Sequence, residues 1–123
     1  MKQEINEMEI NGVVYVKKDS IQEQAKSTEG LPCVIIRTHS AGVHFGYLES
    51  RTGKEVKLVN TRRIWYWSGA ASLSQLALEG TNKPADCKFC VELPSIELME
   101  AIEVIPVSKN AEKIIKEVKI WKQ

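Results

Sequence analysis

Residues 33–67 read CVIIRTHSAGVHFGYLESRTGKEVKLVNTRRIWYW, and this stretch decides the fold. Its β-type runs are separated by turn residues rather than by helical patterns. We expect strands over 33–38, 43–50, 55–60 and 62–67. His39-Ser40-Ala41-Gly42 is the first connection, and Arg51-Thr52-Gly53-Lys54 is a turn with glycine where a left-handed backbone is needed. The strands therefore form an antiparallel meander, broken at Asn60-Thr61.

Two helices are expected after the meander. Ser72-Leu73-Ser74-Gln75 fits a capping box with Ser72 as the N-cap, and Gly80 is placed to end the helix after about two turns. A second helix is expected over 111–122, with Asn110 as its N-cap. Its apolar face has helical spacing and consists of Ile114, Ile115, Val118 and Trp121.

The segment between the helices adds two strands, Phe89 to Leu93 and Ala101 to Val107, and Pro94 and Pro106 indicate sheet edges or bends. We therefore expect an α+β fold. It consists of an antiparallel β-meander, open or curled, with a short central helix and a C-terminal helix packed on one face.

The first 32 residues are expected to form a hairpin and a loop. Asn11-Gly12 is a turn signal between Ile10 and the apolar residues 13–16, and residues 17–30 are mostly polar. A chain of 123 residues has the usual size of one domain, so 1–123 is interpreted as a single domain whose core is 33–123.

Composition limits the classes of partner. Seventeen Lys and Arg balance sixteen Asp and Glu, and the net charge of +1 provides no overall field for nucleic acid or an anionic membrane, although a local basic patch is compatible with it. The start of the chain is polar and no apolar run is long enough to cross a bilayer, so we expect a cytoplasmic protein. Edge strands and exposed aromatic residues need cover, which leaves homo-oligomers open.

The segment from Arg62 to Ser72 concentrates binding chemistry. Arginine forks hold phosphate, aromatic faces stack bases or sugars, and the small residues Ser68-Gly69-Ala70-Ala71 let a ligand approach a helix N-terminus. The alternative is structural. Because residues alternate along a strand, Ile64 and Tyr66, or Trp65 and Trp67, are core residues, and residues 68–71 are then only a tight junction.

The hairpin end from Arg37 to His44 forms a second wall of this pocket if the meander brings it beside Trp67; otherwise it is an ordinary polar turn. The predicted ligand-binding residues are Arg37, Thr38, Ser40, His44, Tyr47, Arg62, Arg63, Trp65, Trp67, Ser68 and Ser72.

Catalytic and metal sites are not expected. His39 and His44 are the only histidines and neither lies in a catalytic motif, so the protein is interpreted as a non-enzyme. Cys87 and Cys90 have zinc-like spacing, but no second pair completes four ligands, so no metal and no cofactor are predicted. Three cysteines do not make a disulfide scaffold, and Cys33 is interpreted as a buried apolar residue.

Two stretches, 33–48 and 62–76, resemble a family of small proteins encoded by phages, prophages and plasmids, known mainly as a domain of unknown function. The resemblance extends from about Cys33 to the terminal helix and implies no activity or ligand residue. It implies a setting, because small accessory phage proteins commonly bind a host signalling nucleotide or defence protein.

These observations lead to one hypothesis and one alternative. The hypothesis is a non-catalytic phage or mobile-element protein that sequesters a small anionic, nucleotide-like ligand of the host as a counter-defence. The alternative is a protein–protein inhibitor of a host factor that uses Trp, Tyr and Arg as interface anchors. A nucleic-acid-binding module is less favoured because of the near-zero net charge.

Overall fold

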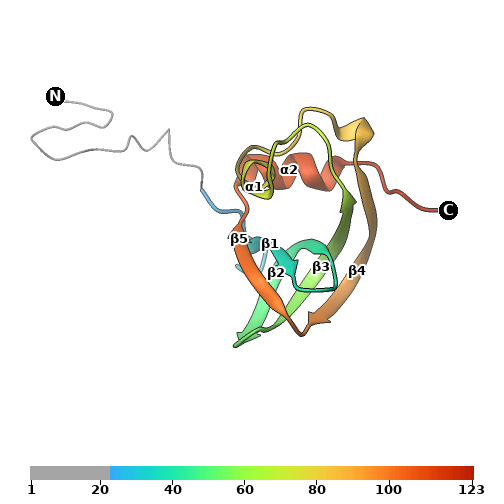
Figure 1. Cartoon of the computed structure of the whole chain (residues 1–123). Helices are drawn as coiled ribbons and strands as arrows, with labels where there is room; N and C mark the ends of the chain where they lie inside the picture. The colour runs from blue at the N-terminus through green and yellow to red at the C-terminus, as the bar shows by residue number, and fades with distance from the viewer. Residues whose placement is uncertain (1–22) are drawn as a thin grey trace, which may run out of the picture.

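The computed structural model describes residues 23–123. Five strands and two α-helices follow one another in it, with a short 3-10 turn before the fourth strand (Figure 1). Their bounds are β1 Cys33–Thr38, β2 Val43–Thr52, β3 Glu55–Tyr66, α1 Leu73–Glu79, η2 Pro84–Asp86, β4 Lys88–Leu98, β5 Ala101–Pro106 and α2 Lys109–Glu117. The predicted α+β class with a central and a C-terminal helix is confirmed.

The strands form one antiparallel sheet in the order β4-β3-β2-β1-β5. β1, β2 and β3 are joined by tight turns and pair as a meander, as predicted. β4 and β5 lie at opposite ends of this order and are not paired with each other, so the sheet is open rather than curled. Both proline-containing strands are thus edges, which agrees with the loss of a ladder hydrogen bond at proline.

The larger core lies between the sheet and the two helices, which cover the same face (Figure 1). Ile35, Phe45 and Phe89 project from the sheet and meet Leu76 of α1 and Ile115 of α2, all fully buried. Period-two alternation places the neighbouring residues of the same strands on the opposite face. That second face has its own smaller cluster, consisting of Val34, Ile36, Val56, Leu58 and Leu98.

β3 is one continuous strand, so the predicted break at Asn60-Thr61 is wrong. Asn60 instead takes a left-handed backbone with φ 47°, and the β2–β3 register shifts beside it. Asparagine tolerates this conformation better than most residues. The next residue, Thr61, donates its hydroxyl hydrogen bond to the carbonyl of Phe45 at 2.8 Å and keeps the strand paired.

The C-terminal helix differs from the prediction at both ends. Its N-cap is Ser108, whose hydroxyl accepts from the amide of Ala111 at 3.0 Å, and not Asn110. The helix ends at Glu117, and Val118 already has extended backbone. The chain beyond it pairs with β4 instead, where the amide of Trp121 donates to the carbonyl of Phe89 at 2.9 Å. This tertiary pairing overrides the helical spacing of the side chains.

The segment before β1 is anchored in the core. Ala25 is buried, its amide donates to the carbonyl of Val107, and its carbonyl accepts from the amide of Cys33, each at 2.8 Å. The hairpin predicted around Asn11-Gly12 lies outside the described residues, and the single-domain interpretation of 1–123 stays a prediction. No helix within residues 23–123 is long and apolar enough to span a membrane.

The start of α1 confirms Ser72 as the N-cap, whereas the Gln75 side chain reaches back to the amide of Ala71 rather than to that of Ser72. The hydroxyl of Ser72 accepts from the amide of Gln75 at 3.1 Å, and Gln75 Oε1 accepts in return from the amide of Ala71 at 2.7 Å. Ser72→Ala is expected to lower the free energy of unfolding by about 1 kcal/mol, since one amide of the first turn loses its acceptor. Denaturant melts measure the free energy of unfolding. Ser74→Ala is the control, because Ser74 is exposed and its replacement should change that free energy by less than about 0.5 kcal/mol. Equal midpoints for the two variants would contradict the cap assignment.

Candidate functional site

A pocket of about 370 Å³ lies between the β1–β2 turn and the end of β3. Its lining residues are Ser40, Ala41, Gly42, Val43, Arg63, Ile64, Trp65 and Trp67. The β2–β3 register pairs Val43 with Ile64, which sets the turn beside the last residues of β3. The meander therefore brings the two stretches singled out in the sequence to one place. We call this cavity the Trp65 pocket.

Two predicted ligand-binding residues shape the turn rather than the pocket surface. The buried Thr38 hydroxyl donates to the carbonyl of Gly42 and accepts from the amide of Ala41, both at 2.8 Å. His44 is 1% exposed, and its Nε2 donates to the carbonyl of Ala41 at 2.9 Å. Burial lowers the pKa of His44, so the ring is neutral at neutral pH. Both side chains hold one wall in position without lining it.

The two tryptophans have different surroundings. Trp67 is half-buried against the main core, and its indole N–H donates to the carbonyl of Ala70 at 3.2 Å. Trp65 is 62% exposed and stacks on Trp121, with the ring centroids 6.0 Å apart and the planes 18° from parallel. Ile64, the residue before Trp65, points into the core. Trp65 is therefore largely open to solvent, whereas Trp67 lines the pocket from the side of the core.

The adjacent arginines separate onto opposite faces of β3. Arg62 is 4% exposed, and its guanidinium donates to three backbone carbonyls: Cys90 at 2.9 Å, Phe89 at 3.0 Å and Ile115 at 3.0 Å. The expectation that Arg62 meets phosphate is therefore wrong, because its donors join β3, β4 and α2. Arg63 is exposed, lines the Trp65 pocket, and has no ion pair with the described carboxylates.

The remaining predicted residues lie outside the Trp65 pocket. Arg37 donates to Glu103 across the β1–β5 pair at 2.9 Å. Tyr47 donates its hydroxyl to Glu112 in a short hydrogen bond, and burial followed by this contact raises its pKa. Ser68 uses its backbone carbonyl to accept from Thr81, and Ser72 caps α1. α1 has seven residues, and the Ser72 side chain already accepts from an amide of its first turn.

A second cavity, around Tyr47, is less suited to an anion. It has a volume of about 440 Å³ and is lined by three carboxylates, Glu29, Glu92 and Glu112, against two lysines, Lys26 and Lys116. Its aromatic residues, Phe45 and Tyr47, are both buried, and Tyr47 is engaged with Glu112, so neither offers a free face for stacking.

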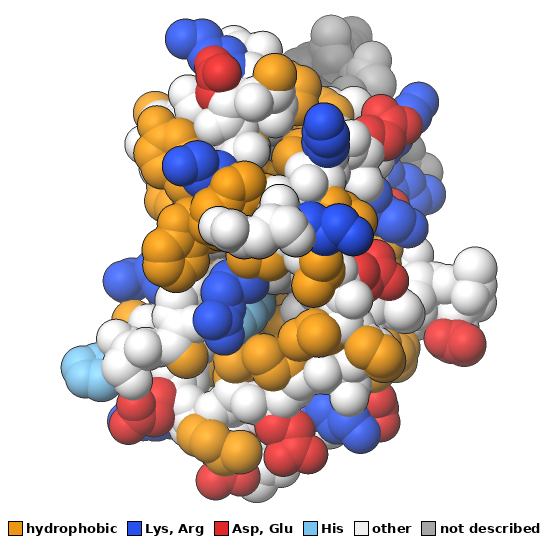
Figure 2. All heavy atoms as spheres, turned by 90° about the vertical axis from the view of Figure 1, so that its right-hand side faces the viewer, with side chains coloured by type: hydrophobic (Ala, Val, Ile, Leu, Met, Phe, Trp, Pro, Cys, Tyr) orange, Lys and Arg blue, Asp and Glu red, His pale blue; other side chains and the backbone are white. Residues whose placement is uncertain are grey.

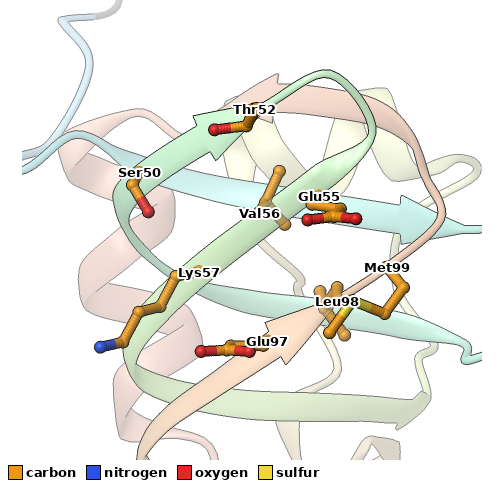
Figure 3. Close-up of a pocket in the computed structure, with 8 residues that line it drawn as sticks. All are labelled: Ser50, Thr52, Glu55, Val56, Lys57, Glu97, Leu98 and Met99. Carbon is orange, nitrogen blue, oxygen red and sulfur yellow. The ribbon is translucent and has the colours of Figure 1, made fainter.

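A third cavity lies beside the β2–β3 turn and is lined by the end of β2, the start of β3 and the end of β4 (Figure 3). Figure 3 shows Glu55 and Glu97 on it, with Lys57 at the side and no aromatic ring. Its volume of about 170 Å³ is below the range of about 300–1,000 Å³ typical of ligand sites. The Trp65 pocket combines sufficient size, a cation and an exposed aromatic ring, and so does a cavity of about 590 Å³ lined by Trp121, Lys119 and Lys122.

The Cys87 and Cys90 thiols do not converge on a common centre. Cys87 is buried, with its sulfur 3.5 Å from the carbonyl of Ser68 and 3.6 Å from that of Lys83. Cys90 lies on β4 and lines a separate cavity with His44 and Arg63. Within residues 23–123 no group of three or more potential metal ligands occurs, and the prediction of no metal stays a prediction.

Sequence reasoning missed two residues at the rim of the site. Helical spacing places Trp121 on the apolar face of the terminal helix, but the residue follows that helix and stacks on Trp65. Lys88, the first residue of β4, places its ammonium 5.4 Å from the Trp121 ring centre. No local signal marks either residue, because both positions depend on the pairing of the C-terminal segment with β4.

Fold and pocket together define a small α+β domain whose open antiparallel sheet carries a ligand-sized cavity at one strand end. The chain belongs to the family described as Domain of unknown function (DUF6948), whose model matches residues 31–115. No curated protein and no solved structure matches the chain. The resemblance to a domain of unknown function is thus confirmed, whereas a phage origin stays a prediction.

Proposed function

We propose that the protein is a non-catalytic binding protein and that the Trp65 pocket takes a small anionic, nucleotide-like ligand. One observation carries the proposal: a cation without an ion-pair partner among the described residues, Arg63, shares an open pocket with the exposed ring of Trp65. A guanidinium can hold phosphate through two parallel hydrogen bonds, and an aromatic face can stack a base. The pocket volume suits a ligand of that size.

The walls of the pocket support the same assignment. Ala41 and Gly42 are small, so a ligand can approach the backbone of the turn, and Ser40 adds a hydroxyl. No carboxylate lines the pocket to repel an anion. Neither histidine lines it, so neither is placed to act as a base on a bound ligand, which favours binding over catalysis.

The proposed setting rests on the family resemblance alone. We infer an accessory protein of a phage or other mobile element that acts in the host cytoplasm and sequesters a host signal as a counter-defence. Identification of the ligand that copurifies with the native protein, by mass spectrometry, tests this setting. An intact host nucleotide supports sequestration, and a chemically altered one indicates an enzyme.

Arg63→Ala is expected to weaken nucleotide binding by about tenfold to a hundredfold, because a hydrogen bond to a charged group contributes about 1.5–3 kcal/mol. The melting temperature is expected to stay unchanged, since Arg63 is exposed. Titration calorimetry against a panel of mono-, di- and cyclic nucleotides measures the affinity, and scanning calorimetry measures the melting temperature. Arg37→Ala is the matched control, because Arg37 is also exposed but lies outside the pocket and pairs with Glu103. Equal affinity of both variants, or no binding of any nucleotide, contradicts the proposal.

A second candidate function is inhibition of a protein partner. Exposed aromatic residues favour it, since Trp65, Tyr66 and Trp121 are between 41% and 62% exposed and Trp and Tyr dominate interface hot spots. The self-association left open by the sequence belongs to the same candidate. Sedimentation of the free protein tests for self-association. A pull-down with the Tyr66→Ala variant tests for a protein partner separately from nucleotide binding, because Tyr66 does not line the Trp65 pocket.

A further inference from the structure

The Trp65 pocket and a second cavity are each lined by one ring of the stacked tryptophan pair. Trp121, which stacks on Trp65, lines a cavity of about 590 Å³ beside η2. The other residues lining it are Pro84, Ala85, Cys87, Lys119, Ile120 and Lys122. The C-terminal segment is held there by its pairing with β4 at Phe89. The aromatic pair therefore contributes one ring to each of the two cavities.

Basic side chains follow this surface from one cavity to the other. Arg63 lines the first cavity, Lys88 lies over the Trp121 ring at 5.4 Å, and Lys119 and Lys122 line the second. None of the four forms an ion pair with a carboxylate in the described part of the chain, and neither cavity has Asp or Glu in its lining. Figure 2 faces the right-hand side of Figure 1, where the C-terminal segment lies, and shows Lys and Arg side chains among hydrophobic ones, with Asp and Glu side chains on the same face.

A mononucleotide would use only part of this arrangement. One base and one phosphate suffice to occupy Trp65 and Arg63. Trp121 lies against Trp65 and Lys88, and Lys119 and Lys122 are left without an ion pair among the described residues. Successive aromatic faces along a basic groove are the features by which proteins hold single-stranded nucleic acid, because every unpaired base has a face to stack. The net charge of +1 is no obstacle, because the cations are concentrated locally.

We propose that the ligand site extends across the Trp65–Trp121 pair and binds a short single-stranded oligonucleotide. The first nucleotide occupies the Trp65 pocket and the following ones run along Trp121 toward Lys119 and Lys122. This inference rests on the proposed function and specifies its ligand class as longer than one nucleotide. DNA and RNA share the recognised chemistry, so the test includes both.

The test measures the affinity of the full chain for labelled oligothymidylates and oligouridylates of increasing length, by fluorescence anisotropy. Affinity is expected to rise at least tenfold from the mononucleotide to a length at which it levels off. The double variant Lys119→Gln/Lys122→Gln keeps both tryptophans and is expected to bind the longer oligomers, and only those, about tenfold more weakly. Its salt dependence should be shallower, by about 0.7 in the logarithmic slope for each phosphate that the variant no longer neutralises.

Stacking is tested separately by Trp121→Ala, which should weaken the longer oligomers about tenfold and the mononucleotide less than twofold. Met99→Ala is the control, because Met99 is similarly exposed but lines the cavity of Figure 3. Unchanged melting temperatures establish that the variants are folded. If Trp121→Ala is not folded, the lysine double variant alone tests the proposed extension of the site.

The outcomes separate the two proposals. A mononucleotide that binds as tightly as every longer oligomer overturns the extension and leaves the Trp65 pocket intact. No binding at any length overturns the proposed function itself. A polyglutamate peptide that competes as well as the oligonucleotide also overturns this inference, because the surface then recognises acidic chains without base stacking.

Discussion

Replacing Arg62 with methionine is expected to lower the free energy of unfolding by about 3–5 kcal/mol, a size typical of breaking a buried charged network. The guanidinium is 4% exposed, and its three hydrogen bonds of 2.9–3.0 Å satisfy carbonyls of β4 and α2. Methionine fills much of the same volume but makes none of these hydrogen bonds, and a hydrogen bond from a charged donor contributes about 1.5–3 kcal/mol. The carbonyls of Phe89 and Ile115 each keep one backbone donor, the amides of Trp121 and Val118, which limits the loss. Denaturant unfolding measures the loss.

Arg63→Met is the matched control for this prediction. Arg63 is the next residue along β3 but is exposed, so its replacement should change stability by less than about 0.5 kcal/mol. Arg62→Lys retains the charge but has no planar fork, and it should fall between the two. If both methionine variants have the same free energy of unfolding, the hydrogen bonds of Arg62 to β4 and α2 do not contribute to stability as described.

Gly69→Ala is the second large effect, with an expected loss of about 2–4 kcal/mol. Gly69 has φ 85°, where an L side chain is strained by about 1–2 kcal/mol. A Cβ there would also lie 2.7 Å from the backbone nitrogen of Lys83 and 2.9 Å from Asn82 Oδ1, and such overpacking costs about 1–3 kcal/mol. The thermal midpoint should therefore drop by several degrees.

Gly42→Ala separates strain from overpacking. Gly42 also has φ 85°, but a Cβ there would meet nothing within 4 Å. Its loss should be limited to about 1–2 kcal/mol of backbone strain. Equal losses for Gly69→Ala and Gly42→Ala would show that the Gly69 junction is not tightly packed against residues 81–83.

Much of the fold follows from local sequence signals. The turns at residues 39–42 and 51–54, the cap at Ser72 and the prolines of β4 and β5 each have a local physical cause, and the structure contains each feature. The continuity of β3 and the end of α2 do not follow locally. Asn60 is accommodated by a register shift against β2, and the residues after Glu117 pair with β4. Both outcomes depend on strands distant in sequence.

The sequence predicts the place of the candidate site but only some of its members. Ser40, Arg63, Trp65 and Trp67 meet in one pocket because the β2–β3 register sets the first turn beside the end of β3. Arg62 and Arg63 have the same chemistry, and strand alternation alone does not tell which one faces the core. Arg62 faces the core, where it donates to the carbonyls of Phe89, Cys90 and Ile115, and the sequence pattern does not predict the positions of these acceptors.

The small residues after Trp67 illustrate the same limit. Residues 68–71 have the composition of a phosphate-approach loop, yet Gly69 is needed where the chain packs against residues 81–83. Trp67 also turns its indole N–H back to the carbonyl of Ala70. The small residues therefore serve the strand-to-helix junction, in agreement with the structural alternative.

The most direct test of the proposed site is a nitrogen-15 NMR titration of the labelled full chain with mono-, di- and cyclic nucleotides. The account predicts that the indole N–H of Trp65, the side chain of Arg63 and the amides of residues 40–43 shift together and saturate. Shifts confined to the Tyr47 cavity around Glu112 and Lys116, or no shift with any nucleotide of the panel, would contradict it.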